Sequence, residues 1–259
     1  MQLGLDGRVA LVAAASSGLG LAVARELAAE GAHVAIGARD PARLAAAREQ
    51  VDAAGPGRVL ATAVDVRDAG AVVRWVAEAT AELGGLGVVV ANAGGPPRGM
   101  ARAFDLAAYR DALELSLLSS IGLVQAALPR LVAAGWGRVL FITSQSVRQP
   151  IPTLALSNTA RLGIVGYAKS LVADLADAGV TGVTVNVLAP GSTRTARLEQ
   201  VAGDDVEAGI AAMARDIPLG RVGRPEEFAA AAAFLASDRA SFITGVTLPV
   251  DGGAIRGVF

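Results

Sequence analysis

Short apolar runs alternate along the chain with longer stretches of helical period. The runs are rich in Val, Leu, Ile and Ala, and they predict strands at 8–13, 33–37, 58–64, 87–91, 137–143, 182–188 and 246–250. The stretches between them are rich in Ala, Leu, Glu and Arg, which is typical of helices. Strands that are almost wholly apolar and separated by helices indicate βαβ units. The pattern therefore predicts an α/β fold: a doubly wound, Rossmann-type parallel sheet of about seven strands with helices on both faces.

The alternation continues without a linker, a low-complexity tract or any other repeat. A chain of 259 residues can form one domain that buries roughly three quarters of its unfolded surface. We therefore expect a single domain over residues 1–259. Two predicted helices, at about 105–134 and 153–178, are longer than covering a sheet requires. Gly163 and Gly166 in the second would permit close packing, either against another subunit or within the chain.

Charge and composition exclude several classes of function. A net charge of −1 and a pI near 5.9 give no electrostatic reason to expect binding to nucleic acid or to an anionic membrane. The apolar runs are interrupted by Gly, Asp or Arg well before the roughly 20 residues that a membrane span needs. No basic region precedes the first apolar run, as it would in a signal peptide. We expect a soluble, cytoplasmic protein.

The residues that most often bind metals are scarce. The chain has no cysteine, which excludes disulfides, thiolate nucleophiles and cysteine-ligated metals. Its one histidine, His33, excludes a multi-histidine metal site and any triad that needs a second imidazole. His33 begins a predicted strand, so we interpret it as structural. We expect no metal site.

Small residues follow the first predicted strand and lead into a helix that continues through Glu30. At such a turn backbone N–H groups can approach a diphosphate, and the helix N-terminus adds partial positive charge. The turn also lies at the first strand-to-helix junction, where ligands bind beyond the carboxyl ends of the strands. It predicts a dinucleotide site that includes Ala14, Ser16, Ser17, Gly18, Leu19 and Gly20.

The second strand ends in Ile36-Gly37-Ala38-Arg39, without the acidic residue that would bind a ribose 2′-hydroxyl. The Arg39 guanidinium matches the geometry of a 2′-phosphate with paired donors. The sequence therefore favours NADP(H) over NAD(H), with a solvated surface arginine as the alternative.

Short motifs also follow the later strands. They are Asp65-Val66, Asn92-Ala93-Gly94, Thr143-Ser144, Asn186 with Pro190-Gly191, and Gly223-Arg224-Pro225-Glu226-Glu227 leading to Leu248-Pro249-Val250-Asp251-Gly252-Gly253. With the glycine turn they make the chain resemble the short-chain dehydrogenase/reductase family essentially from end to end. The C-terminal part most resembles the β-ketoacyl carrier-protein reductase branch.

This resemblance implies further cofactor contacts and a covering loop. Asp65 and Val66 would contact the adenine, Asn92, Ala93 and Gly94 would border the riboses, and Pro190, Gly191, Thr193 and Thr195 would lie around the nicotinamide carboxamide. Residues from about 192 to 221 would form a mobile loop over the substrate. The family usually has Thr-Gly where this chain has Ala13-Ala14, and the Ala14 methyl narrows the space beside the cofactor.

The resemblance also implies a catalytic set of Asn, Ser, Tyr and Lys. Counting along the two long helices places these positions at Ser116, Ser144, Ser157 and Arg161, so that only Ser144 keeps the family residue. A serine hydroxyl is a far weaker acid than a phenol, so Ser157 is a poor proton donor. Arg161 keeps the positive charge and can hold the nicotinamide ribose, but it cannot relay a proton.

No other residue is a convincing replacement for the missing phenol. Tyr167 and Tyr109 are better interpreted as packing residues, which leaves Arg148 or a water molecule as proton source. Two functions remain open. The first is an atypical NADP(H)-dependent oxidoreductase that transfers hydride to or from a carbonyl-type substrate. The second is a catalytically silent homologue that binds nucleotide and acts as a regulatory or oligomer partner. The resemblance implies a homo-oligomer, either a dimer or a tetramer.

Overall fold

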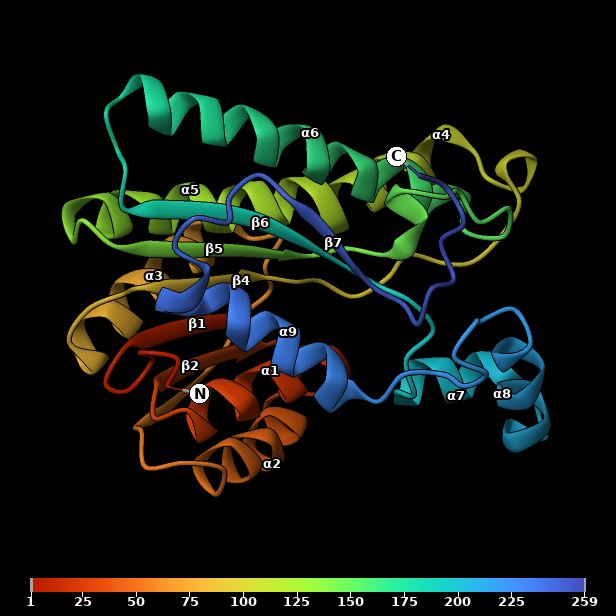
Figure 1. The fold of residues 1–259 in the computed structure, drawn as a ribbon, viewed down its shortest axis with the longest axis horizontal. Helices are drawn as coiled ribbons and strands as arrows, with labels where there is room; N and C mark the ends of the chain where they lie inside the picture. The colour runs from red at the N-terminus through yellow and green to blue at the C-terminus, as the bar shows by residue number, and fades with distance from the viewer. Residues whose placement is uncertain (1, 259) are drawn as a thin grey trace.

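Seven parallel strands form the central sheet of the computed structural model, which describes residues 2–258 (Figure 1). The strands are β1 (Val9–Ala13), β2 (His33–Ala38), β3 (Val59–Ala63), β4 (Val88–Ala91), β5 (Gly137–Ile142), β6 (Val183–Pro190) and β7 (Thr247–Val250). Their order is β3-β2-β1-β4-β5-β6-β7, and every neighbouring pair is parallel. The predicted doubly wound sheet is confirmed, with boundaries within two residues of the expected ones.

The sheet buries the strands that the sequence marks as apolar. Every residue of β1, β4, β5 and β6 is buried, because helices cover both faces of the sheet. In the centre, Leu11 of β1 pairs with Val89 of β4. The chain winds outward from β1 to β3 and then restarts on the other side of β1 with β4. This reversal opens a crevice at the carboxyl ends of β1 and β4.

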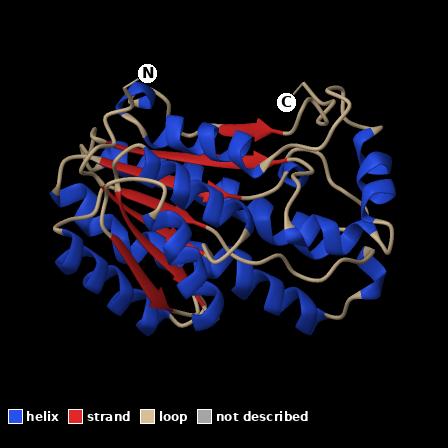
Figure 2. Ribbon diagram, turned by 90° about the horizontal axis from the view of Figure 1, so that it is seen from below, coloured by secondary structure: helices blue, strands red, loops and turns tan. Residues whose placement is uncertain are grey.

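Helices lie on both sides of the sheet (Figure 2). One core cluster joins the sheet to α1 (Gly18–Ala29), α2 (Pro41–Asp52) and α9 (Pro225–Ala236). A second joins the opposite face to α3 (Ala69–Leu83), α5 (Ser119–Ala133) and α6 (Ala155–Asp177). Three one-turn 3₁₀ segments connect other elements: η1 (Ala101–Ala103), η3 (Gln145–Val147) and η4 (Asp238–Ala240).

Side chains at the helix starts explain where several helices begin. Asp40 accepts hydrogen bonds from the backbone N–H groups of Ala42 and Arg43, and Pro41 occupies the first turn of α2. Asp68 caps α3 in the same way. Each cap satisfies a backbone donor that the helix itself leaves without a partner.

The first long predicted helix is one continuous but irregular helix. It runs through α4 (Leu106–Ala112), a π-helical segment η2 (Leu113–Leu118) and α5. At 28 residues it is long and apolar enough to cross a membrane, so the expectation that no stretch has this composition is wrong. Because α5 packs against α3, β4 and β5, it occupies the place of a core helix, and core helices commonly have this composition.

The two glycines of α6 have different environments. A Cβ atom at Gly163 would lie 2.9 Å from Cδ2 of Leu117, so this glycine allows α6 to pack closely on η2 within the chain. At Gly166 no described atom lies within 4 Å of such a Cβ. Gly163 therefore permits close packing within the chain, whereas the face of α6 at Gly166 is not covered by the described residues.

Two short helices, α7 (Ala196–Ala202) and α8 (Val206–Ala214), extend beyond the carboxyl edge of the sheet (Figure 1). They belong to the segment predicted to be a covering loop, 192–221. Ile210, Ile217 and Val222 form a small apolar cluster of their own there, separate from the sheet. The segment is thus folded, and its mobility stays a prediction.

Candidate active site

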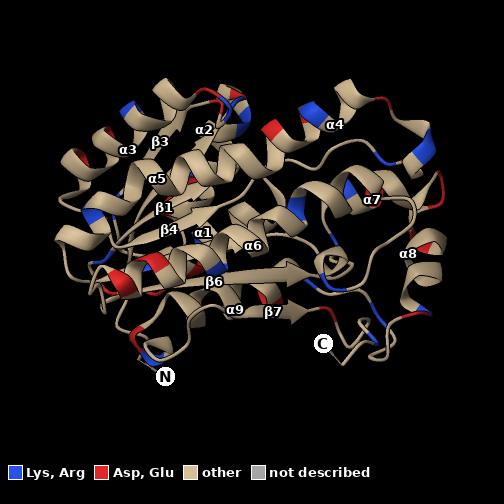
Figure 3. Ribbon diagram, turned by 90° about the horizontal axis from the view of Figure 1, so that it is seen from above, with Lys and Arg blue, Asp and Glu red and all other residues tan. Residues whose placement is uncertain are grey.

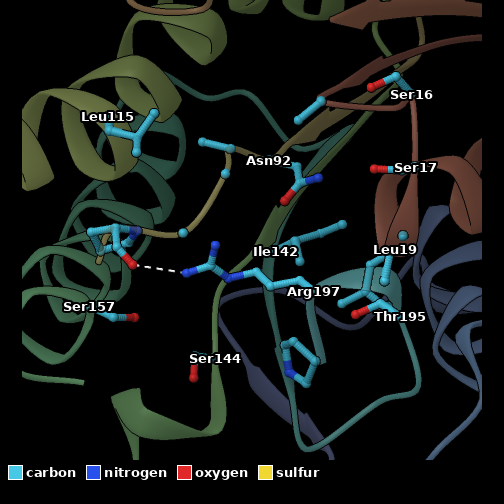
Figure 4. A pocket seen from close by; sticks show the side chains of 18 of the residues that line it. Ser16, Ser17, Leu19, Asn92, Leu115, Ile142, Ser144, Ser157, Thr195 and Arg197 are labelled. Carbon is cyan, nitrogen blue, oxygen red and sulfur yellow. Dashed lines mark hydrogen bonds between the residues drawn. The ribbon is translucent and has the colours of Figure 1, made fainter. Parts of the chain in front are cut away.

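A cavity of about 950 Å³ opens at the carboxyl edge of the sheet (Figure 4). It is lined by the residues that follow β1 to β6 and by one side of α7. Nearly all the predicted cofactor residues are among them: Ala14, Ser16, Ser17, Gly18, Leu19, Arg39, Asp65, Val66, Asn92, Ala93, Gly94, Arg161, Pro190, Gly191, Thr193 and Thr195. The structure therefore brings together residues that lie far apart in the sequence.

Gly20 is the one predicted cofactor residue that does not line the cavity among the residues described. A Cβ atom there would lie 2.5 Å from the carbonyl oxygen of Ala14 and 2.9 Å from Nδ2 of Asn92. Asn92 in turn donates a hydrogen bond to the carbonyl oxygen of Ala13, at 3.3 Å. Gly20 therefore allows α1 to pack against the turn, and it supports the cavity from behind.

The turn itself is strained at Ala14. Its φ of +50° lies in the left-handed region, and no other non-glycine residue in 2–258 has a positive φ. In this region the Cβ atom crowds the following carbonyl oxygen, which costs roughly 1–2 kcal/mol for an L-residue. The glycine that the family pattern predicts at this position would have no such cost.

One end of the cavity is rich in arginine. Arg39, Arg43 and Arg67 line it, and Figure 3 shows basic and acidic segments together near α2. Arg67 binds Asp65 through Nη2 at 2.6 Å, and this hydrogen bond lowers the pKa of the Asp65 carboxyl. Asp40, the other acid at this end, accepts from the backbone at the start of α2.

At the opposite end the cavity is lined by Ser144 and Ser157 (Figure 4). Ser144 caps η3, and its oxygen accepts from the backbone N–H of Ser146 at 3.1 Å. A hydroxyl that accepts can still donate its own hydrogen, so Ser144 can bind a substrate oxygen. Ser157 lies in the first turn of α6 and is 7% exposed.

Arg161 lies one turn beyond Ser157 and is 8% exposed. Its Nη1 donates to the carbonyl oxygens of Ile142 and Thr143, at 2.9 and 3.0 Å, and Nη2 donates to that of Ala93 at 3.5 Å. Burial, and to a smaller extent the charge of the nearby Arg197, lower the pKa of Arg161 to about 10. The guanidinium is therefore a fixed cation at neutral pH that joins the end of β5 to the loop after β4.

Ser116 is not brought into this group. It is 1% exposed on the π-helical segment η2, and within the described chain its hydroxyl has no hydrogen-bond partner and does not line the cavity. Three of the four predicted catalytic residues thus share the cavity. A catalytic role for Ser116 stays a prediction.

The alternative proton donors also lie elsewhere. Tyr167 packs edge-on against Phe141, with ring centroids 6.1 Å apart, and burial raises its pKa. Tyr109 donates weakly to the carbonyl oxygen of Ala101, and Arg148 to that of Thr247, each at 3.5 Å. In the part of the chain that the structure describes, none of the three lines the cavity.

Sequence reasoning missed Arg197, which comes from α7 and crosses the cavity (Figure 4). Its Nη2 donates to the carbonyl oxygen of Pro96 at 2.9 Å, and its guanidinium lies against Gly95, where a Cβ atom would be 3.1 Å away. The only sequence signal is its place two residues after Thr195. Further lining residues that were not expected are Arg43, Arg67, Arg98, Leu115, Leu154 and Leu198.

Known proteins share this sequence and fold. A family model described as enoyl-(acyl carrier protein) reductase matches residues 13–254. The chain is 38% identical over 247 residues to cis-4-hydroxycyclohexanecarboxylate dehydrogenase of Sinomonas cyclohexanicum, covering 95% of this chain and 96% of the relative. It is 34% identical over 251 residues to 3-oxoacyl-(acyl-carrier-protein) reductase of Escherichia coli, covering 97% and 98%.

Two solved structures are similar over nearly the whole chain. L-sorbose reductase of Gluconobacter frateurii, complexed with NADPH and L-sorbose, superposes with a TM-score of 0.94 at 28% identity, and the match covers 100% of both chains. A short chain oxidoreductase of Pseudomonas aeruginosa PAO1, bound to NADPH and described as containing an atypical catalytic center, has a TM-score of 0.92 at 32% identity, covering 98% and 99%.

Proposed function

The chain belongs to the short-chain dehydrogenase/reductase family, in the branch of the 3-oxoacyl-(acyl-carrier-protein) reductases, and from this membership we propose an atypical NADP(H)-dependent oxidoreductase. Its substrate is a carbonyl compound or the corresponding secondary alcohol. The relatives support this class, because one is named for a hydroxy acid and another for a 3-oxoacyl group. We also propose that the protein is cytoplasmic and forms a homodimer or homotetramer, which would cover the open face of α6 at Gly166.

The residues that line the cavity fit NADP(H), both its diphosphate and its 2′-phosphate. The turn from Ala14 to Ser17 leads directly into α1 at Gly18, and Gly20 lets the helix approach the turn closely. At the arginine-rich end, Arg39 and Arg43 can bind a 2′-phosphate with charge-assisted hydrogen bonds. Asp40, the acid next to Arg39, accepts two backbone hydrogen bonds at the start of α2, which hold its carboxylate at the helix N-terminus. These contacts favour NADP(H) over NAD(H).

NADP(H), when bound, supplies or accepts the hydride. The chain must then bind the substrate oxygen and bring it a proton during reduction. Ser144 and Ser157 can donate hydrogen bonds to that oxygen, and the fixed charge of Arg161 stabilises negative charge that develops nearby. No phenol lines the described cavity, so the proton comes from water through the serine hydroxyls.

The proposal depends most on one observation: Ser144, Ser157 and the buried Arg161 share a single cavity with the arginine-rich end. The second candidate is a nucleotide-binding homologue without redox turnover. Ser157 favours this second function, because a serine stands where the family pattern predicts the tyrosine that acts as general acid. NADPH binding is common to both functions, and turnover distinguishes them.

The test is oxidation of NADPH by the wild type and by a double variant, Ser157→Tyr with Arg161→Lys, on a panel of ketones and enones. We expect slow turnover by the wild type. The double variant should be faster by about 10²–10⁴-fold, which is the usual contribution of a positioned general acid.

The matched control is Ser157→Phe with Arg161→Lys, which adds the ring without its hydroxyl. It should bind NADPH as the tyrosine variant does and stay slow. A wild type that binds NADPH but never oxidises it would favour the silent homologue. Equal rates for the tyrosine and phenylalanine variants would contradict the assignment of position 157.

A further inference from the structure

Two guanidinium groups meet at the catalytic end of the cavity. Arg161 is fixed by three carbonyl oxygens beneath Ser157, and Arg197 reaches across from α7 (Figure 4). Their charges are close enough to repel, since Arg197 lowers the pKa of Arg161. Backbone carbonyls orient both groups but neutralise neither.

No acid balances these charges where they meet. Asp40 and Asp65 are the only acidic residues that line the cavity in the described chain. Asp40 caps α2 and Asp65 is paired with Arg67, so both are occupied at the arginine-rich end. The catalytic end thus has the two positive charges of Arg161 and Arg197, the first largely removed from water, and the exposed Arg98 adds a third beside Leu154, where it donates to Thr153. No acidic residue of the described cavity lies among them. Such an arrangement favours an anionic ligand.

Apolar residues also line this end. Leu115 lies on the side of Ser157 in Figure 4, and Leu154 precedes Ser157 by one turn. Leu198 follows Arg197 on α7 and also lines the cavity. A ligand that fills this space would therefore combine an apolar body with one charged group.

We propose that the substrate of this site is an oxo acid or hydroxy acid whose carboxylate is bound by Arg197. The inference rests on the proposed function and adds the substrate class. In the present structure Arg197 donates to the neutral carbonyl oxygen of Pro96. A carboxylate is a stronger acceptor and can take two parallel hydrogen bonds from the guanidinium, so it would replace that contact. Because Arg197 belongs to α7, the bound acid would also hold the covering segment in place.

The cofactor diphosphate is the other anion that could bind Arg197. The experiment therefore measures both affinities by calorimetry. NADPH is titrated first into the protein, and then 4-oxopentanoate or 4-oxocyclohexanecarboxylate is titrated into the NADPH-loaded protein, each beside its uncharged methyl ester.

The wild type should bind at least one acid about tenfold more tightly than its ester, because one charge-assisted hydrogen-bonded pair contributes that much. Arg197→Gln should remove this preference while NADPH affinity changes less than about twofold. The matched control is Arg215→Gln, which removes the same charge from an exposed position at the end of α8 and should keep the preference.

Three results would overturn the proposal. One is that neither acid binds more tightly than its ester, including the case in which neither binds. Another is that Arg197→Gln weakens NADPH binding and leaves the acid preference intact, which would assign the guanidinium to the cofactor. The third is that Arg215→Gln has the same effect as Arg197→Gln. If NADPH itself does not bind, the proposed function fails together with this inference.

Discussion

Two single residues stand at positions where the family pattern predicts another residue. Ala14 has a left-handed backbone although it has a side chain. Arg161 has a positive charge where the family pattern predicts a lysine, and its guanidinium binds three carbonyl oxygens that a lysine ammonium could not bind in the same planar arrangement.

Replacing Ala14 by glycine should stabilise the protein. Relief of the left-handed strain gains roughly 1–2 kcal/mol, and the greater freedom of glycine in the unfolded chain offsets about half of it. For a chain of this length we expect the melting temperature to rise by about 2 °C in calorimetry. The control is Ala15→Gly, at a fully buried neighbour without positive φ, which should lower the melting temperature. A destabilised Ala14→Gly variant would contradict the strain argument.

At this scale the sequence predicts much of the site. The family spacing along the second long helix groups Ser144, Ser157 and Arg161, and all three line one cavity. The spacing along the first long helix also places Ser116 in the group, where the structure does not bring it, and neither spacing indicates Arg197. The position of Ser116 depends on the π-helical turn, which rotates a side chain without any change in the residue pattern. Arg197 depends on how a short helix folds back across the cavity, which no local pattern encodes.

Among the elements, the segment that carries α7 and α8 is attached to the rest of the fold by few contacts. Arg194 on its near side binds Glu199 and Glu207 within the segment. Its far end is held at the start of α9, where Arg221 donates to Glu227 at 2.6 Å and the backbone N–H of Arg224 donates to the same carboxylate at 2.8 Å. The Glu227 carboxylate therefore anchors the covering segment to α9.

Glu227 should make this anchor sensitive to acid. The hydrogen bond from Arg221, and then that from Arg224, lower the pKa of Glu227 from 4.5 to about 2. Because the pKa is lower in the folded protein, its contribution to stability is complete above pH 4.5 and is lost as the pH falls toward 2. Urea unfolding should show a wild type more stable than Glu227→Gln at neutral pH, with the difference shrinking in acid.

Glu226→Gln, at the exposed neighbouring position of α9, is the matched control and should show little difference at any pH. A gap between the wild type and Glu227→Gln that stays constant from neutral pH to pH 2 would contradict the assigned pKa of Glu227.

Over the whole molecule, the order of the strands explains why the site lies where it does. Winding reverses between β1 and β4, and the turns that follow these strands form the centre of the cavity. Apolar runs and glycine turns suffice to predict this architecture, since the central strands β1, β4, β5 and β6 are buried on both faces. The pattern also predicts the long helix at about 105–134, which the structure confirms as α4, η2 and α5, but it does not predict the π-helical segment, which packing decides.

The most direct test of the account is the affinity of the wild-type protein for NADPH and NADH, measured by calorimetry in the same buffer. Arg39 and Arg43 predict that NADPH binds at least about tenfold more tightly, because each guanidinium can make charge-assisted hydrogen bonds to the 2′-phosphate. Arg39→Gln should remove most of that difference and leave NADH binding nearly unchanged. If neither nucleotide binds, or if both bind equally tightly, the assignment of the cavity as an NADP(H) site is contradicted.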